Sequence, residues 1–123
     1  IGLPPQWHLE VPYTLDDARE AARYLFNLND RPTAVVCGND LIARGCADAL
    51  REAGISCPAE VALTGFDNWT VMAEACRPAL TSVDMNLIQL GAKAGQQMTE
   101  MIKGAEASGT LRLPCTLVVR DST

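Results

Sequence analysis

The chain has 123 residues, of which 48% are hydrophobic and 20% charged, and its formal net charge is −5 at pH 7. This length can bury a core without metals or disulfides, and the composition is that of a folded chain rather than a disordered one. No apolar run approaches the roughly 18 residues of a membrane helix, and the basic residues form no cluster that would bind DNA or an anionic membrane. We therefore expect one globular domain with neither a membrane nor nucleic acid as a direct partner.

The N-terminal third predicts a strand and then a helix. Residues 7–11 alternate between apolar and polar side chains, which is the pattern of a strand. Thr14 and Asp17 have the spacing of an approximate capping box, so a helix is expected to begin here and to end before Pro32. Its apolar stripe comprises Leu15, Ala18, Ala22 and Leu25.

A second strand and helix follow. Residues 33–37 are apolar after the initial Thr, which predicts a strand covered on both faces. We expect Asp40 to cap the next helix and Gly54 to end it. The inward face of this helix is predicted to consist of Ile42, Cys46, Ala49 and Ala53.

The next elements are a strand over residues 61–64, a turn over 65–68, a short helix and a strand over 80–83. The longest helix is predicted from about Asn86 to Lys103. Its expected buried face is Leu87, Leu90, Ala94, Met98 and Met101.

Within that helix, Gly91 and Gly95 lie one turn apart and would allow another element to approach closely. Residues 104–110 have the composition of a loop, and residues 115–119 predict the last strand. Strands that alternate with helices predict an α/β fold with a mostly parallel sheet and helices on both faces.

The five cysteines are odd in number, include no C-x-x-C pair and are accompanied by one histidine. This pattern argues against a disulfide framework and against a zinc site, so we expect no metal and no cofactor. All five are interpreted as small, reduced and buried hydrophobic residues, which suits a cytoplasmic protein. They are Cys37, Cys46, Cys57, Cys76 and Cys115.

Candidate ligand-binding residues follow three predicted strands, where open α/β sheets bind ligands. They are Tyr13, Asn39, Asp40, Asp67 and Asn68. Carboxylate and amide groups bind hydroxyls, and an aromatic ring offers a flat apolar face, so the set suits a neutral polyhydroxylated ligand. The glycines at positions 38 and 65 would allow sharp turns at this rim. A plainer interpretation is that Asp40 and Asn68 cap helices and that the others are turn residues.

Four segments resemble motifs of the LacI/GalR (lactose-repressor) family of transcriptional regulators, in the order in which that family has them. The segments are residues 31–40 (RPTAVVCGND), 53–68 (AGISCPAEVALTGFDN), 77–83 (RPALTSV) and 113–122 (LPCTLVVRDS). Glu60 stands where the family usually has Asp, and Ser82 where it usually has Thr.

The resemblance implies a periplasmic-binding-protein-like (type I) core, with residues 1–123 as most of its C-terminal lobe. Residues 86–103 would cross to an N-terminal lobe that this chain lacks. The DNA-binding headpiece is also expected to be absent, so operator DNA would be bound elsewhere in the parent protein. The family further implies a homodimer and a small-molecule effector, most often a sugar or sugar derivative.

Site residues can also be transferred from the resemblance. Asn39 and Asp67 match positions that hydrogen-bond the effector, and Tyr13 matches an aromatic residue that stacks on or walls it. Trp69 could line the mouth of the cleft or belong to the core, whereas Phe66 is expected in the core.

Two other functions are compatible with parts of this sequence. An exported solute-binding protein of a sugar transporter would share the fold, but the unpaired cysteines and the close match of the four segments to repressor motifs favour a regulator. An enzyme would need an acid–base group such as His8, yet no nucleophile motif or phosphate loop accompanies it. We therefore expect a cytoplasmic regulator rather than an enzyme.

Overall fold

The computed structural model describes residues 2–106 and 109–123. The elements in chain order are η1 (Pro5–Trp7), α1 (Leu15–Phe26), β1 (Ala34–Val36), α2 (Asp40–Glu52), β2 (Ala62–Phe66), α3 (Thr70–Ala75), β3 (Thr81–Asp84), α4 (Leu87–Ile102) and β4 (Thr116–Val118). The loop predicted at residues 104–110 includes 107 and 108, which lie outside the described residues.

The four strands form one sheet in the order β1-β2-β3-β4. The first three are parallel, with Val35 opposite Leu63 and Thr64 opposite Thr81. The last strand runs antiparallel to β3. The predicted α/β class with a mostly parallel sheet is therefore confirmed, and the carboxyl ends of β1, β2 and β3 share one edge.

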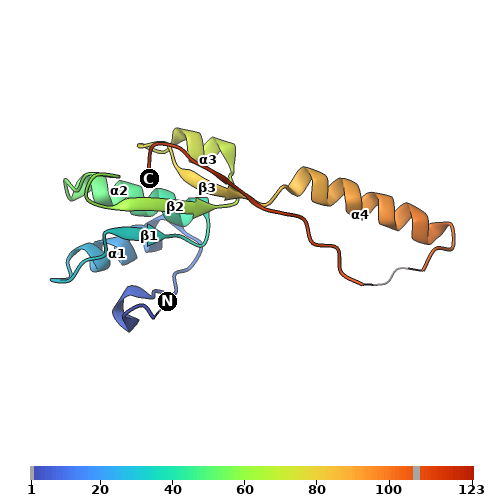
Figure 1. The fold of residues 1–123 in the computed structure, drawn as a ribbon. Coiled ribbons are helices and arrows are strands. Elements are labelled where there is room, and N and C mark those ends of the chain that lie inside the picture. Colours follow the sequence, from blue (N-terminus) through green and yellow to red (C-terminus); the bar gives the residue numbers. More distant parts are fainter. Residues whose placement is uncertain (1, 107–108) are drawn as a thin grey trace.

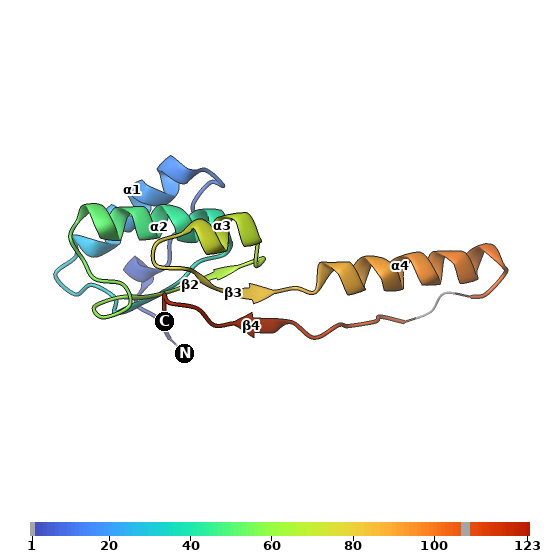
Figure 2. The same cartoon turned by 90° about the horizontal axis from the view of Figure 1, so that it is seen from above.

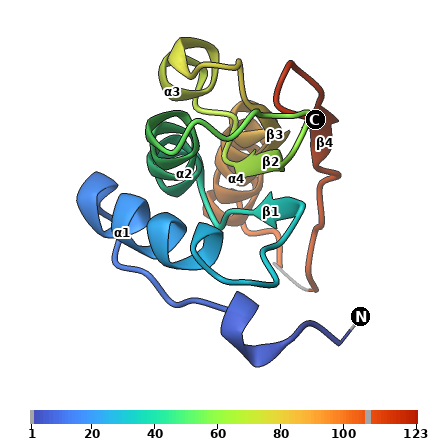
Figure 3. The ribbon, with the colours of Figure 1, turned by 90° about the vertical axis from the view of Figure 1, so that its left-hand side faces the viewer.

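Helices α1, α2 and α3 lie on the same side of the sheet (Figure 3). On the helix-facing side of β2, Leu63 and Gly65 are buried, while Thr64 and Phe66 on the other side are half-buried. In β1, Val36 is 84% exposed. The expectation of helices on both faces, and of a β1 covered on both faces, is wrong for the described residues because α1 to α3 cover only one.

The packing of α1 on α2 follows the predicted amphipathic stripe. The Thr14 hydroxyl accepts a hydrogen bond of 3.2 Å from the Asp17 backbone N–H, which confirms the predicted start of α1. Gly45 of α2 allows the close crossing, since a Cβ there would lie 2.6 Å from the Cβ of Ala18. The core beneath is formed mainly by small residues and branched aliphatic ones, including Leu50, Val61, Leu63 and Leu80.

Residues 7–11 are not a strand, contrary to the prediction. Residues 5–7 form the 3-10 helix η1, and the following residues pair with no strand in the described chain. Their side chains nevertheless alternate as expected, with Trp7, Leu9 and Val11 half-buried and the residues between them exposed. Periodicity thus predicted which side chains face the core, but a strand also requires a neighbour with which to exchange backbone hydrogen bonds.

Helix α4 extends away from the other helices and from most of the sheet (Figures 1 and 2). None of its residues is buried, and the apolar side chains of Ile88, Leu90 and Met98 are 92%, 45% and 61% exposed. The predicted buried face is therefore wrong within this chain. No described atom of another element lies within 4 Å of a Cβ added at Gly91 or Gly95, so the expected close approach is also not seen.

Three of the five cysteines meet the expectation of burial. Cys37, Cys46 and Cys76 are buried, Cys57 is half-buried and Cys115 is exposed. A hydrogen bond with the thiol of Cys37, followed by burial, raises the pKa of Cys46, and burial is the main cause of the raised pKa of Cys76. The prediction is wrong for Cys115, because it precedes the short edge strand β4 and is not covered by any helix of the described residues.

Candidate functional site

The candidate site lies where β1 and β2 end. Asn39 follows β1 and occupies the N-cap of α2, where its Oδ1 accepts a hydrogen bond of 2.8 Å from the Ile42 backbone N–H. The predicted cap was Asp40, so that assignment is wrong by one residue. Asn39 remains half-buried, and its Nδ2 has no recorded hydrogen bond to a described residue.

Asp40 has a structural position rather than a capping one. Its side chain is almost fully buried, with 1% of the residue exposed. Oδ1 accepts a hydrogen bond of 2.5 Å from the Ser82 hydroxyl, and Oδ2 accepts one of 2.6 Å from the Trp69 backbone N–H. Because both oxygens are satisfied inside the protein, Asp40 ties α2 to β3 and to the start of α3.

Asp67, directly after β2, has the properties of a group that accepts hydrogen bonds from outside the chain. It is half-buried, and no described residue is recorded as donating a hydrogen bond to its carboxylate. Burial, and then the negative charge of Asp40, raise the pKa of Asp67. A carboxylate that is partly desolvated and has no internal donor can bind the hydroxyls of a ligand.

The backbone at this point is unusual. Asp67 has φ 106° and Asn68 has φ 48°, both in the region that residues with a Cβ rarely adopt. Gly38 and Gly65, which were expected to supply the sharp turns, do not have positive φ. Gly65 instead makes room for α2, because a Cβ there would lie 2.3 Å from Oδ1 of Asp40.

Asn68 does not cap α3, contrary to the plainer interpretation. Its Nδ2 donates to Asp84 Oδ2 over 3.0 Å, and its Oδ1 accepts from Nη2 of Arg120 over 2.7 Å. Its backbone N–H donates to the Ser82 hydroxyl oxygen over 3.0 Å. Asn68 is therefore bound to β3 and to the residues that follow β4, far away in sequence.

The three aromatic residues considered for the site or the core lie in different environments. Trp69 is the N-cap residue of α3 and is 55% exposed, which excludes it from the core. Phe66, predicted as core, is half-buried because it lies on the uncovered face of β2. Tyr13 is 74% exposed and precedes the N-cap of α1.

Tyr13 lies on a groove of about 940 Å³ between the N-terminal segment, α1 and β1. Gly38 at the end of β1 also lines this groove, so it approaches the rim, but Asn39, Asp67 and Trp69 do not line it. The structure thus joins Asp67, Trp69 and Asn39 through their common neighbour Asp40 and places Tyr13 on a neighbouring surface.

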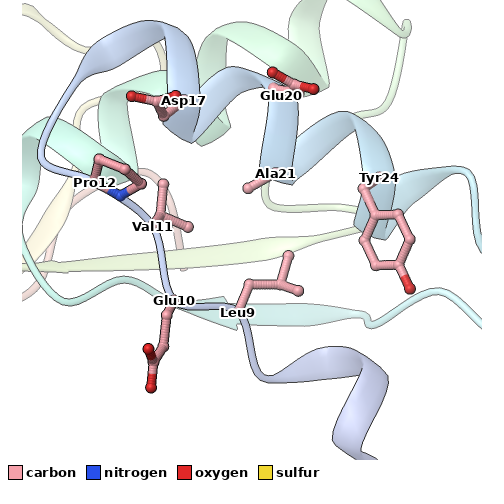
Figure 4. Close-up of a pocket in the computed structure, with 8 residues that line it drawn as sticks. All are labelled: Leu9, Glu10, Val11, Pro12, Asp17, Glu20, Ala21 and Tyr24. Carbon is pink, nitrogen blue, oxygen red and sulfur yellow. The ribbon is translucent and has the colours of Figure 1, made fainter.

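A smaller hollow of about 350 Å³ lies between residues 9–12 and α1. Figure 4 shows its mainly apolar lining, with Leu9, Val11 and Tyr24 among the contributors. Its charged groups are the carboxylates of Glu10, Asp17 and Glu20. It holds none of the predicted site residues.

Among the described residues, no group of three or more His, Cys, Asp or Glu side chains is arranged to hold a metal ion. No helix in the described ranges is long and apolar enough to cross a membrane. His8 is exposed, as expected, although it follows η1 instead of lying in a strand.

Sequence reasoning missed three residues at the site, Ser82, Asp84 and Arg120. Each belongs to or adjoins a motif segment, which was used only to identify the resemblance. No local spacing connects them with Asp40 or Asn68, because their partners are 16 to 52 residues away along the chain.

Comparison with known proteins supplies a family context for this geometry. The periplasmic binding protein-like domain family matches residues 2–123. The HTH-type transcriptional repressor PurR of Vibrio vulnificus is 34% identical over 123 residues, which is 99% of this chain and 36% of the repressor. The chain thus spans about a third of the length of the curated relatives that it matches.

Similar solved structures are also transcriptional regulators. The Escherichia coli transcriptional repressor ascG superposes with a TM-score of 0.89 at 27% identity, over 100% of this chain and 44% of that one. A complex of the transcriptional regulator CelR with cellobiose has a TM-score of 0.87 at 27% identity, over 100% and 38% of the two chains.

Proposed function

This chain belongs to the family of periplasmic binding protein-like domains, in the form that LacI-family transcriptional regulators carry, and on that premise we propose that it binds the small-molecule effector of such a regulator. The observation that carries the proposal is Asp67, a half-buried carboxylate with a raised pKa and no recorded hydrogen-bond donor among the described residues. Asn39 on the neighbouring strand end supplies an amide whose Nδ2 is free to donate, since only its Oδ1 is used by α2.

We propose a neutral polyhydroxylated effector, a sugar or sugar derivative. A carboxylate accepts hydrogen bonds from hydroxyls, and the exposed Trp69 offers an apolar face to the C–H side of a sugar ring. Tyr13, on the neighbouring groove, offers a second such face to a ligand that extends past Gly38. The cellobiose bound by the similar regulator CelR supports this class of ligand.

We further propose that the chain is most of the C-terminal lobe of a larger effector-binding domain, in which α4 crosses to a second lobe. The exposure of every residue of α4 supports this, since an apolar helix of 16 residues is normally covered. The second lobe would close over the rim formed by Asn39 and Asp67. Operator DNA would be contacted by a separate headpiece, in keeping with the acidic charge of this chain, and the parent regulator would be a cytoplasmic homodimer.

Within this family a regulator is the better candidate than a transport receptor, because the relatives and neighbours reported above are transcriptional regulators. The same relationship supports a binding function rather than an enzymatic one.

The test is a panel of pentoses, hexoses and disaccharides, cellobiose included, screened by thermal shift and then titrated by calorimetry. At least one sugar is expected to bind, and Asp67→Ala should weaken that binding by roughly 1–3 kcal/mol because a ligand hydroxyl loses its buried partner. Asp121→Asn is the matched control, since that exposed side chain has no recorded bond to a described residue. Unchanged affinity in Asp67→Ala would refute the site, and a panel in which no sugar binds the parent regulator, with both lobes present, would refute the ligand class.

A further inference from the structure

The left-handed backbone at Asn68 is held from outside its own loop. The side-chain amide has an acceptor on its nitrogen, Asp84, and a cationic donor on its oxygen, Arg120. This pair of opposite charges permits only one orientation of the amide. The Ser82 hydroxyl oxygen accepts from the backbone N–H of the same residue.

Arg120 is itself anchored and cannot follow the loop if the loop relaxes. Its Nη1 donates to the Leu80 carbonyl over 2.7 Å, while its backbone N–H donates to the Thr81 hydroxyl over 2.9 Å. A guanidinium that is fixed in this way presents Nη2 to Asn68 in one direction. The contact joins residues that are 52 positions apart.

The conformation held in this way determines where the Asp67 carboxylate lies. Asp67 has φ 106°, and its backbone N–H donates to the Val83 carbonyl over 3.0 Å. Asn68, with φ 48°, continues this turn towards α3. If Asn68 relaxed to negative φ, the direction of the chain on both sides of it would change, and Asp67 would move with it.

We propose that Arg120 is a positioning residue for the effector: by holding the amide of Asn68 it keeps residues 67 and 68 left-handed and so presents the Asp67 carboxylate to the ligand. This rests on the proposed function. Asp84 assists as the acceptor at the other end of the amide. Hydrogen bonds to its two oxygens, from the Asn86 backbone first and then from Asn68, hold the pKa of Asp84 below its usual range, so it is a charged acceptor at neutral pH.

A purely structural role for Arg120, fastening the C-terminal segment to β3, makes a different prediction. Fastening depends on the Leu80 and Thr81 contacts and not on the side chain at position 68. Glycine adopts positive φ without a steric penalty. If Arg120 acts by keeping residue 68 at positive φ, then Asn68→Gly should make the Asp67 conformation independent of Arg120. If Arg120 only fastens the C-terminal segment, Asn68→Gly should not change the effect of substituting it.

The experiment compares Arg120→Gln, Arg120→Lys, Asn68→Gly and the double variant Asn68→Gly/Arg120→Gln in the same chain. Backbone chemical shifts and amide–Hα couplings of Asp67 and Asn68 report φ without any ligand. Affinity is then measured with cellobiose or with the tightest-binding sugar of the panel. Arg112→Gln is the matched control, because that exposed arginine has no recorded hydrogen bond to a described residue.

In Arg120→Gln we expect the signals of Asp67 and Asn68 to move towards negative φ and sugar binding to weaken about tenfold. Arg120→Lys should fall between Arg120→Gln and the wild type, since an ammonium cannot reproduce the forked contact. In the double variant the Asp67 signals and the affinity should match those of Asn68→Gly alone.

Unchanged Asp67 and Asn68 signals in Arg120→Gln, with shifts only at Leu80 and Thr81, would overturn the proposal. The proposal would also be overturned if Arg120→Gln shifts the Asp67 signals as much in the Asn68→Gly variant as it does in the wild type. If no sugar binds the parent regulator, the proposed function fails, and the Asp67 signals of this chain still decide the role of Arg120.

Discussion

The hydroxyl of Ser82 donates a hydrogen bond of 2.5 Å to Oδ1 of Asp40, although 42 residues separate them. Both side chains are buried, with 0% and 1% of each residue exposed. The same hydroxyl oxygen accepts from the Asn68 backbone N–H. A single small side chain on β3 therefore satisfies the buried carboxylate after β1 and also supports the loop that carries Asp67.

Removing this hydroxyl should destabilise the fold. In Ser82→Ala, Oδ1 of Asp40 loses its only donor among the described residues and the Asn68 N–H loses its acceptor, which should lower the free energy of unfolding by about 1–3 kcal/mol. Urea denaturation followed by circular dichroism measures this. Ser56→Ala is the control, since that serine is exposed and its hydroxyl has no recorded hydrogen bond to a described residue, so its stability should match the wild type.

The space at Gly65 is needed by α2. A Cβ at this position would lie 2.3 Å from Oδ1 of Asp40 and 2.8 Å from Cδ2 of Leu80. Gly65→Ala should therefore destabilise the chain by about 1–3 kcal/mol through overpacking. Gly91→Ala on the exposed face of α4 should instead stabilise it slightly or leave it unchanged. Equal thermal midpoints for the two variants would contradict the packing described at β2.

Exposure of α4 predicts a contrast between two leucines. Leu63 is fully buried, whereas Leu90 is 45% exposed on a helix without buried residues. Leu63→Ala should cost about 2–5 kcal/mol, whereas Leu90→Ala should change the free energy of unfolding by less than about 0.5 kcal/mol. A large loss in Leu90→Ala, measured by urea denaturation of the dilute chain, would mean that α4 is covered in solution.

Glu52 joins α2 to α1 through ion pairs with Arg23 (2.8 Å) and Arg19. Hydrogen bonding to Arg23, and then to Arg19, lowers the pKa of Glu52. Because the folded pKa lies below the unfolded one, this stabilisation is complete above the unfolded pKa and is lost as the pH falls through the folded pKa.

Glu52→Gln should therefore be less stable than the wild type at pH 7, and the difference should shrink towards about pH 3. Denaturant midpoints across this range provide the measurement. Glu20→Gln on α1, an exposed position with no recorded ion pair to a described residue, should follow the wild-type curve at every pH. A pH-independent deficit in Glu52→Gln would show that the loss is one of packing.

Ligand binding should depend on the ionisation of Asp67. Burial, and secondarily the charge of Asp40, raise its pKa, so the carboxylate becomes protonated at a higher pH than a free aspartate does. Since the charged form is the better acceptor of hydroxyl hydrogens, sugar affinity should fall as the pH is lowered through this raised pKa. Calorimetric titrations at several pH values test this, and Asp67→Asn should abolish the dependence. A wild-type affinity that does not change with pH would contradict the role of the carboxylate.

The stability of the fold should depend on pH in the opposite direction from sugar affinity. With the folded pKa of Asp67 raised, the folded chain takes up a proton more readily, so this group favours folding at low pH and the benefit is lost as the pH rises through the raised pKa. Asp67→Asn should thus be at least as stable as the wild type near neutral pH, while binding less tightly. This separation distinguishes a binding residue from a structural one.

Local sequence determined the elements whose stabilising contacts are local. The cap at Thr14 spans three residues, and the alternation at residues 7–11 follows from side-chain polarity alone. The positions of Asn39 and Asp67 at neighbouring strand ends follow from the strand–helix order. Their roles as ligand-binding residues were inferred from the family resemblance and remain predictions.

Only the tertiary structure decided which polar groups satisfy one another and which apolar faces are covered. Asp40 was predicted to cap a helix, but the Ser82 hydroxyl and the Trp69 N–H draw its carboxylate into the core. Residues 7–11 lack a strand partner, and α4 lacks a covering surface within the described chain. Periodicity predicts which side of an element is apolar. The hydrogen bonds of Ser82 with Asp40 and of Arg120 with Asn68 join residues that are separated by 42 and 52 positions, so they form only when the fold brings β3, β4 and the rim together.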